Sequence, residues 1–201
     1  MSTSKKYAFV LLLLLIGYVY MTYPSLFTSL SHLKFPTFHI STGSLMGNAL
    51  ANTVNDVSIV GTPDMSTNAI NAVLKSVNSP ARGTGQALYN GSLASGVKVS
   101  FALAIFKHES GYGTAGVARA THSLGNIRCS NGYACINGYR AYTSWVASYT
   151  DFYTLIKNLY ITQKHLTTVG QVLHTYAPTS ENSTSDYIAD VLASMNTWKD
   201  R

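Results

Sequence analysis

The chain has 201 residues, of which 46% are hydrophobic and 11% charged, and its 14 Lys and Arg exceed its 8 Asp and Glu to give a net charge of +6. A positive balance favours an anionic partner, such as nucleic acid, anionic lipid or an anionic cell-wall polymer. The basic residues stand singly apart from Lys5-Lys6, and no run of them is interleaved with aromatic residues as a phosphate-tracking surface requires. The composition therefore argues against nucleic acid as a partner.

An uncharged, apolar segment over residues 7–23 follows Lys5-Lys6 and has aromatic residues at both ends. It is just long enough to cross the hydrocarbon core of a bilayer. Because positive charge precedes it and the next charge is Lys34, residues 1–6 are predicted to be a cytoplasmic tail and the rest of the chain to lie outside. A cleaved signal peptide is the alternative, but no Ala-x-Ala site follows the apolar core, so we expect a retained single-pass anchor in the lipid bilayer.

Residues 24–56 are predicted to be a spacer. They are rich in Ser, Thr, Asn and Gly, contain Pro24 and Pro36, and show no sustained hydrophobic period. Residues 57–201 then remain for one domain, which is long enough to bury a hydrophobic core.

Three helices are predicted in the first half of this domain. The first begins near residues 62–66 and is broken by Ser79-Pro80, and its hydrophobic residues recur at helical spacing: Ile70, Val73, Leu74 and Val77. The second covers residues 85–95, with three side chains predicted to face inward: Ala87, Leu88 and Leu93. The third covers residues 99–109 and is almost wholly apolar, which is typical of a buried helix.

A glycine-rich, irregular stretch over residues 110–139 follows and is compatible with short strands or a loop lobe. It contains both cysteines, Cys129 and Cys135. Two cysteines alone do not make a structural zinc site, and in a chain exported across a membrane a disulfide that closes this short loop is predicted. Two free thiols are the alternative.

Helical patterns return after this stretch, over residues 144–156, 169–176 and 186–198. The last of them carries hydrophobic residues on one side: Ile188, Val191, Leu192 and Met195. The predicted fold class is therefore mainly α with a small loop or β lobe.

Glu109 ends the apolar helix and is followed at once by Ser110-Gly111. A carboxyl group half-sunk in an apolar wall has its charged form disfavoured, so its pKa is predicted to be raised. A general acid for glycosidic cleavage requires such a carboxyl group. A solvated helix end is the structural alternative.

Four sequence blocks carry a family resemblance. In chain order they are Ala104–Thr114 around Glu109, Ser123–Ile127, Tyr139–Trp145 with Asp151, and Tyr176–Asn182 with Tyr187. In order and spacing they resemble the endo-β-N-acetylglucosaminidases of glycoside hydrolase family seventy-three, which are peptidoglycan hydrolases. The resemblance covers roughly residues 57–201, and the anchor and spacer lie outside it.

The resemblance implies a lysozyme-like α-helical fold with a small loop or β lobe and a cleft that holds glycan. It implies that Glu109 protonates the leaving oxygen of a β-1,4 bond in the glycan strand of peptidoglycan. It also assigns sugar binding to an amide and several aromatic side chains: Tyr112, Asn126, Tyr139, Tyr142 and Tyr176. The structural alternative for Tyr139 and Tyr142 is that they pack the domain, and Trp145 and Trp198 are expected in the core.

The chain departs from a two-acid mechanism, because residues 110–139 contain no carboxylate. Three routes stay open. Asp151 or Glu181 acts as a distant base on water, the substrate's own N-acetyl group acts as nucleophile, or Glu109 acts alone and forms an anhydro sugar as lytic transglycosylases do. A muramidase on the same fold is a further alternative.

Two non-enzymatic interpretations also remain. One is a membrane-tethered module that binds wall glycan without cutting it, and the other is a virion membrane protein. The preferred hypothesis is a peptidoglycan hydrolase with an extracytoplasmic domain, at a bacterial cell surface or on a virion membrane. His108 and His122 flank Glu109 in sequence, but no third ligand has a fitting spacing, so neither a metal nor an organic cofactor is predicted.

Overall fold

The computed structural model describes residues 56–177 and 183–198. All of these residues belong to one compact unit. The predicted tail, the predicted anchor over residues 7–23, the spacer up to residue 55, and Glu181 all lie outside the described residues. Within the described part, no helix has the length and apolarity needed to span a membrane.

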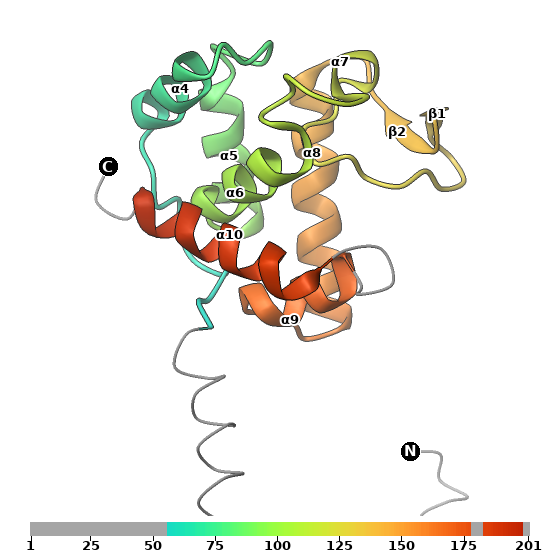
Figure 1. Cartoon of the computed structure of the whole chain (residues 1–201). Helices are drawn as coiled ribbons and strands as arrows, with labels where there is room; N and C mark the ends of the chain where they lie inside the picture. Colours follow the sequence, from blue (N-terminus) through green and yellow to red (C-terminus); the bar gives the residue numbers. More distant parts are fainter. Residues whose placement is uncertain (1–55, 178–182, 199–201) are drawn as a thin grey trace, which may run out of the picture. The chain divides into compact units, whose positions relative to one another are not determined.

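The described domain is mainly helical with one small hairpin, as predicted (Figure 1). Its helices are α4 (Thr67–Ser76), α5 (Gly85–Ser95), α6 (Val99–Ser110), α7 (Ala118–Thr121), α8 (Trp145–Leu155), the π-helix η2 (Ile156–Gln163), α9 (Val169–Tyr176) and α10 (Thr184–Thr197). Helix α10 packs against α6 and α9, and α5 packs against α4 and α8. Helix α5 also contacts α6, and the rings of Tyr149 and Phe152 on α8 pack on Phe106 of α6.

Helix α6 forms the centre of the hydrophobic core, since every residue from Val99 to Phe106 is buried. The helix ends at Gly111, whose φ of 54° lies in the left-handed region. The N–H groups of Gly111 and Tyr112 donate back to the carbonyls of Lys107 and Phe106, each at 2.9 Å. Glu109 therefore lies on the last turn of α6, where the helix leaves the core.

Asp56 holds the start of the described segment to the domain. Its carboxylate accepts hydrogen bonds from the Thr168 hydroxyl at 2.5 Å and from the Gly170 N–H at 2.8 Å. A carboxylate at this position caps the N-terminus of α9. The ordered contacts of the domain thus reach one residue before the predicted boundary at residue 57.

Most of the helix predictions are confirmed, and the differences have physical reasons. Leu93 was predicted to face inward but is 62% exposed. The inward position one turn after Leu88 belongs to Ser92, which is buried and donates its hydroxyl to the Val97 carbonyl at 2.6 Å. Beyond the predicted end near residue 156, α8 continues without a break into η2.

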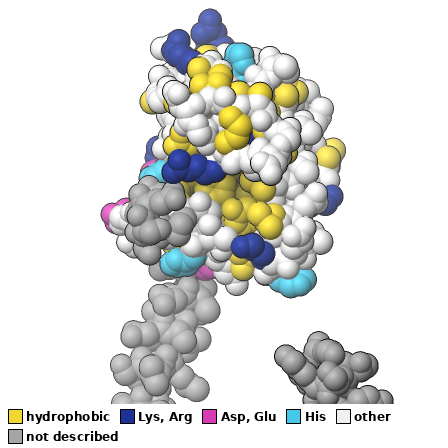
Figure 2. Space-filling view, turned by 90° about the vertical axis from the view of Figure 1, so that its right-hand side faces the viewer, with side chains coloured by type: hydrophobic (Ala, Val, Ile, Leu, Met, Phe, Trp, Pro, Cys, Tyr) yellow, Lys and Arg dark blue, Asp and Glu magenta, His cyan; other side chains and the backbone are white. Residues whose placement is uncertain are grey.

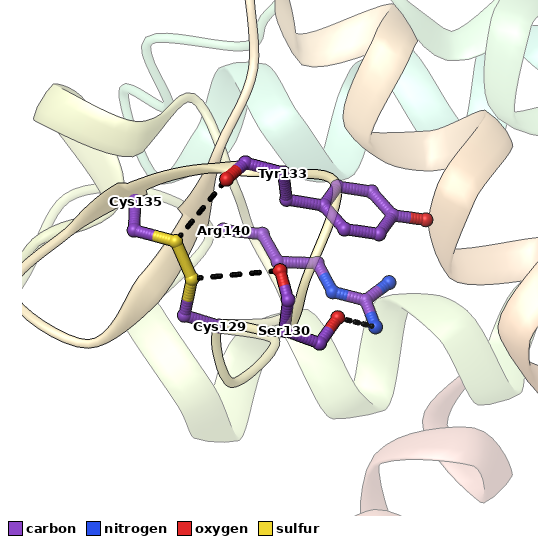
Figure 3. The surroundings of a disulfide bond; sticks show 5 residues. All are labelled: Cys129, Ser130, Tyr133, Cys135 and Arg140. Atoms are coloured by element: carbon purple, nitrogen blue, oxygen red, sulfur yellow. Dashed lines mark hydrogen bonds between the residues drawn. A yellow bond between two sulfur atoms is a disulfide. The ribbon is translucent and has the colours of Figure 1, made fainter.

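A two-stranded antiparallel hairpin forms the small lobe, with β1 (Ala134–Ile136) paired to β2 (Tyr139–Ala141). Its turn is Asn137-Gly138, and both residues have positive φ, which is the pattern of a type I′ turn. The predicted disulfide between Cys129 and Cys135 is present and closes the loop that leads into β1 (Figure 3).

Loss of this disulfide, by reduction or by changing both cysteines to Ser, is expected to lower the free energy of unfolding by about 2 kcal/mol, because a short closed loop restricts the unfolded chain. Thermal unfolding with and without reductant measures the effect. The double Ser variant serves as the control, since reductant should not change its melting temperature. An equal loss in that variant on adding reductant would contradict the assignment.

Candidate active site

A cleft of about 450 Å³ opens beside the last turn of α6. Its lining comes from α6, the loop before β1, strand β2, the α8–η2 helix and α9. The face that carries the hairpin and α8 shows a hydrophobic hollow with Lys and Arg side chains at its edge (Figure 2). Glu109 lines the cleft, together with three of the residues predicted to bind sugar: Asn126, Tyr139 and Tyr176.

Glu109 is only partly exposed, and its Oε1 accepts a hydrogen bond of 2.7 Å from the Tyr187 hydroxyl. Burial raises the pKa of Glu109, and the Tyr187 hydrogen bond and the charges of His108 and Arg128 offset part of this rise. The direction agrees with the sequence-based expectation. The side chain is thus a carboxyl group that holds its proton to higher pH than an exposed glutamate does.

Helix α10 holds the end of α6 through three consecutive side chains. Lys107 Nζ lies 2.7 Å from Asp190 Oδ1, and His108 Nδ1 lies 3.0 Å from Asp190 Oδ2. The His108 ring also stacks on Tyr187, with centroids 3.7 Å apart, and Tyr187 is 1% exposed. Burial and stacking thus hold the Tyr187 ring in place independently of the hydrogen bond from its hydroxyl to Glu109.

Sequence reasoning placed Tyr187 in a family block but gave it no role. One signal was available. Tyr187 and Asp190 are three residues apart and so share a face of α10, and Lys107, His108 and Glu109 are consecutive at the end of α6. Only the packing of α10 on α6 shows that the pair on α10 contacts the three residues at the end of α6.

Replacing Tyr187 by Phe is expected to raise the pKa of Glu109 further, because the lost hydrogen bond stabilises the ionised carboxylate. A carbon-13 NMR titration of the Glu109 carboxyl group measures the shift. Tyr160→Phe is the matched control, since Tyr160 also lines the cleft but its hydroxyl has no described bond to Glu109. An unchanged Glu109 pKa in Tyr187→Phe would refute the assigned hydrogen bond.

The Asn126 side chain is held against the backbone of Glu109. Its backbone is left-handed with φ of 43°, and its Nδ2 donates to the Glu109 carbonyl at 2.7 Å. The preceding residue is held too, because the Tyr176 hydroxyl donates to the Gly125 carbonyl at 2.7 Å. Asn126 Oδ1 is buried and has no hydrogen-bond partner among the described residues, so it offers an acceptor to a bound ligand or water.

The structure does not bring Tyr112 and Tyr142 to the cleft lining. The left-handed turn after α6 sends Tyr112 toward α4, where it is 6% exposed and borders a separate hollow with Val73 and Trp198. Burial raises the pKa of Tyr112 to about 12. The Tyr142 hydroxyl instead donates to Asp151 at 2.6 Å. Tyr142 thus follows the structural alternative of packing the domain, and Tyr112, which was assigned to sugar binding, is buried away from the cleft.

Asp151 is the acceptor of a polar network behind the hairpin. It receives hydrogen bonds from the hydroxyls of Tyr133 at 2.7 Å and Tyr142 at 2.6 Å, and from Arg140 Nη1 at 2.8 Å. Burial raises the pKa of Asp151, but the three hydrogen bonds and the Arg140 charge together bring it below the usual range. A carboxylate held in this way is a weak base. It also does not line the cleft.

The cleft thus contains one carboxylate, Glu109, among its described lining residues. Over residues 56–177 and 183–198, no group of His, Cys, Asp and Glu is arranged to hold a metal ion. The side chains that line the cleft provide a carboxyl group at Glu109, an amide acceptor at Asn126, and aromatic rings at Tyr139, Tyr160 and Tyr176. Aromatic rings of this kind pack against the apolar face of a ring-shaped ligand.

Comparison with known proteins finds similar structures but no similar sequences. No protein family matches the chain, and none of the curated proteins shows significant sequence similarity to it. The structure of S. aureus autolysin E superposes with a TM-score of 0.52 at 15% identity, over 73% of this chain and 71% of that protein. A structure of autolysin E in complex with the muropeptide NAM-L-Ala-D-iGlu gives a TM-score of 0.50 at 14% identity, over 75% and 76% of the two chains. At these identities the likeness establishes a shared fold.

Proposed function

We propose that this chain is a peptidoglycan hydrolase that cleaves β-1,4 bonds of the glycan strand, with Glu109 as the general acid. The observation that carries the proposal is the partly buried Glu109 with its raised pKa, placed on the last turn of α6 inside a cleft lined by aromatic side chains. Acid-assisted glycosidic cleavage requires a protonated carboxyl group at the leaving oxygen. The aromatic rings beside it can bind the apolar face of the sugar.

Two further lines of support come from the sequence blocks and the fold. The blocks around Glu109, Asn126, Tyr139 and Tyr176 resemble the endo-β-N-acetylglucosaminidase family, and each block contributes residues to the same cleft, these four among them. The fold is shared with autolysin E, which has been seen with a muropeptide. We therefore assign the endo-β-N-acetylglucosaminidase reaction as the proposed activity.

The proposed reaction needs one protein carboxyl group. Glu109 gives its proton to the leaving glycosidic oxygen while the carbonyl oxygen of the substrate's N-acetyl group attacks the anomeric carbon and forms a cyclic oxazolinium ion. Water then adds to the anomeric carbon, the Glu109 carboxylate takes the proton from that water, and the ring reopens to the N-acetyl group. This route is favoured because the other candidate within the described residues, Asp151, is held by three donors away from the cleft.

A lytic transglycosylase is the second candidate, and the same observation favours it. In that reaction Glu109 gives its proton to the leaving glycosidic oxygen, and the bond between that oxygen and the anomeric carbon of a muramic unit breaks. The C6 hydroxyl of the same unit then bonds to the anomeric carbon, its proton passes to the Glu109 carboxylate, and a 1,6-anhydro ring forms without water. One carboxyl group suffices for this route as well.

The product of digestion distinguishes the two. Purified peptidoglycan is treated with the full-length protein in mild detergent, and the fragments are analysed by mass spectrometry. Reducing N-acetylglucosamine ends, absent when Glu109→Gln replaces the native protein, are the expected result. Anhydro-muramic ends would assign a transglycosylase, and reducing muramic ends a muramidase. Retained binding to sacculi without any product would overturn the enzymatic proposal in favour of a binding module.

We further propose that residues 7–23 anchor the chain in a bilayer with the domain on the extracytoplasmic side, where peptidoglycan lies. The support is the apolar segment itself and the two lysines before it. Protease added to intact cells or virions that carry the protein should then digest the domain. Protection of the domain until the membrane is opened would contradict this orientation.

A further inference from the structure

Two tyrosines beside the acid use their hydroxyls within the protein. Tyr176 donates to the Gly125 carbonyl and Tyr187 donates to Glu109, each at 2.7 Å. Tyr160 lines the same cleft, but its hydroxyl has no hydrogen-bond partner among the described residues. The ring of Tyr160 is nevertheless packed into the domain, since the residue is only 7% exposed. Tyr160 therefore combines a fixed ring with an unused hydroxyl.

The Tyr160 hydroxyl is accessible from the cleft. In the described part of the chain, three buried side-chain polar atoms have no hydrogen-bond partner: Asn126 Oδ1, Arg140 Nε and the Tyr153 hydroxyl. The Tyr160 hydroxyl is not one of these buried atoms, although it has no partner either. An unpaired hydroxyl at the surface of a cleft can form its hydrogen bond with a ligand that replaces water there.

Contacts with Tyr176 place Tyr160 near the acid. The two rings have centroids 6.0 Å apart and planes tilted by 47°. Burial is the main cause that raises the pKa of Tyr176, and the negative charges of Glu109 and of ionised Tyr160 raise it further. Both Glu109 and Tyr160 therefore lie close to Tyr176, within one cleft of about 450 Å³.

The π-helix η2 explains why Tyr160 faces this cleft. Leu155, directly before η2, and Tyr160 are five residues apart, and both line the cleft. In an α-helix, residues five apart point about 140° away from each other around the axis. The hydrogen bonds of a π-helix join residues five apart, so its wider turn brings such residues nearer to one face. Turns of this kind are rare and occur often at functional sites.

Tyr160 and Asn126 together supply one donor and one acceptor. Burial raises the pKa of Tyr160, so the hydroxyl keeps its proton well above neutral pH and can donate it to a hydrogen bond. Asn126 Nδ2 donates to the Glu109 carbonyl at 2.7 Å, which leaves Oδ1 as the acceptor. An acetamido group has the complementary pair, a carbonyl oxygen that accepts and an N–H that donates.

We propose that the Tyr160 hydroxyl donates a hydrogen bond to the carbonyl oxygen of the substrate's acetamido group, while Asn126 Oδ1 accepts from its N–H, and that these contacts orient the acetamido group for attack on the anomeric carbon. This inference rests on the proposed function. A carbonyl oxygen has two lone pairs, so one can accept from Tyr160 while the other forms the bond to carbon. Tyr160, which lies outside the four sequence blocks, is thus a catalytic residue in addition to Glu109.

The binding test compares two forms of one ligand. Soluble, uncross-linked glycan strands are used as prepared, or after a peptidoglycan N-deacetylase has removed their acetyl groups. Dissociation constants are measured with full-length Glu109→Gln protein in mild detergent, which leaves the strands uncut. Adding Tyr160→Phe should weaken binding to acetylated strands about fivefold, as for one hydrogen bond, and leave binding to deacetylated strands unchanged. This substitution changes no charge, so the amines of the deacetylated strands affect both proteins equally.

Cleavage by otherwise native protein is the second readout. Tyr160→Phe should lower kcat by about 10-fold to 100-fold, more than it raises KM, because the acetamido group loses its orientation for attack. The melting temperature and the pH dependence of the rate should stay native, since the Tyr160 hydroxyl has no described partner and Tyr187 is the tyrosine that donates to Glu109. Tyr89→Phe is the matched control, because Tyr89 lies on α5, is partly buried and does not line the cleft.

The outcomes separate this inference from the proposed function. Equal weakening toward both strand forms, an equal effect of Tyr89→Phe, or a native kcat in Tyr160→Phe would overturn the role of Tyr160 and leave the proposed reaction standing. Failure of the native protein to release any product from peptidoglycan would instead overturn the proposed reaction itself.

Discussion

Glu109→Gln is expected to lower the rate of glycan cleavage by about 10²–10⁴-fold, the usual contribution of a general acid. The amide keeps the size of the side chain and its acceptor for the Tyr187 hydroxyl, so the cleft should keep its shape. It has no proton to give to the leaving oxygen. The rate is measured by release of reducing ends from purified peptidoglycan, and sacculus binding is measured beside it.

Two variants separate chemistry from position. Glu109→Asp keeps a carboxyl group but withdraws it by one methylene, so most of the rate should be lost while some proton donation remains. Asp186→Asn makes the same acid-to-amide change at an exposed residue in the first turn of α10 and should keep the native rate. A Glu109→Gln protein with a rate near the native one would remove Glu109 from the mechanism.

Glu109→Gln is also expected to stabilise the protein at neutral pH. Because the pKa of Glu109 is raised in the folded state, the folded protein binds more protons than the unfolded chain between the two pKa values. The stability of the native protein is therefore highest below the unfolded pKa and falls as the pH rises through the folded pKa. Glu109→Gln avoids this loss, so its melting temperature should exceed the native one at pH 8 and approach it at pH 4. Partial burial of the Glu109 carboxyl group thus reduces stability at neutral pH.

The sequence predicted the helices and the position of the acid because local signals determine both. An apolar run surrounds Glu109, and Gly111 supplies the left-handed residue that ends α6. Asn126, Tyr139 and Tyr176, which the family blocks single out, line the same cleft as Glu109, and their role in sugar binding stays a prediction.

The sequence did not predict contacts that depend on how elements pack. Tyr112 stands three residues after Glu109, but the turn between them directs it to α4. Tyr187 contacts Glu109 only because α10 lies along α6. The partners of Asp151 come from both sides of the hairpin, and no periodic pattern in the sequence marks such a cluster.

Asp151→Asn is expected to lower the free energy of unfolding by about 3 kcal/mol, the low end for removing one partner of a buried ion pair. The side chains of Arg140 and Asp151 are 12% and 15% exposed, so loss of the negative charge leaves the guanidinium largely buried without its counter-ion. Tyr133 and Tyr142 also lose a charged acceptor. Because Arg140 and Tyr139 share strand β2, the substitution should also loosen the cleft rim and weaken glycan binding.

The effect of Asp151→Asn can be tested by its pH dependence and by comparison with a substitution in a more exposed ion pair. The pKa of Asp151 is lowered in the folded state, so its contribution is complete above the unfolded pKa and is lost as the pH falls through the folded pKa. Denaturant unfolding should therefore show the largest difference between the two proteins at pH 7 and a smaller one in acid. Asp190→Asn breaks the more exposed contacts of Asp190 with Lys107 and His108, whose side chains are 34%, 43% and 33% exposed. It should cost less than Asp151→Asn, because each exposed pair contributes no more than about 1 kcal/mol. An equal decrease in the free energy of unfolding for Asp151→Asn and Asp190→Asn would contradict this prediction. It would mean that the hydrogen bonds to Asp151 do not stabilise the hairpin or position Arg140 beside the cleft.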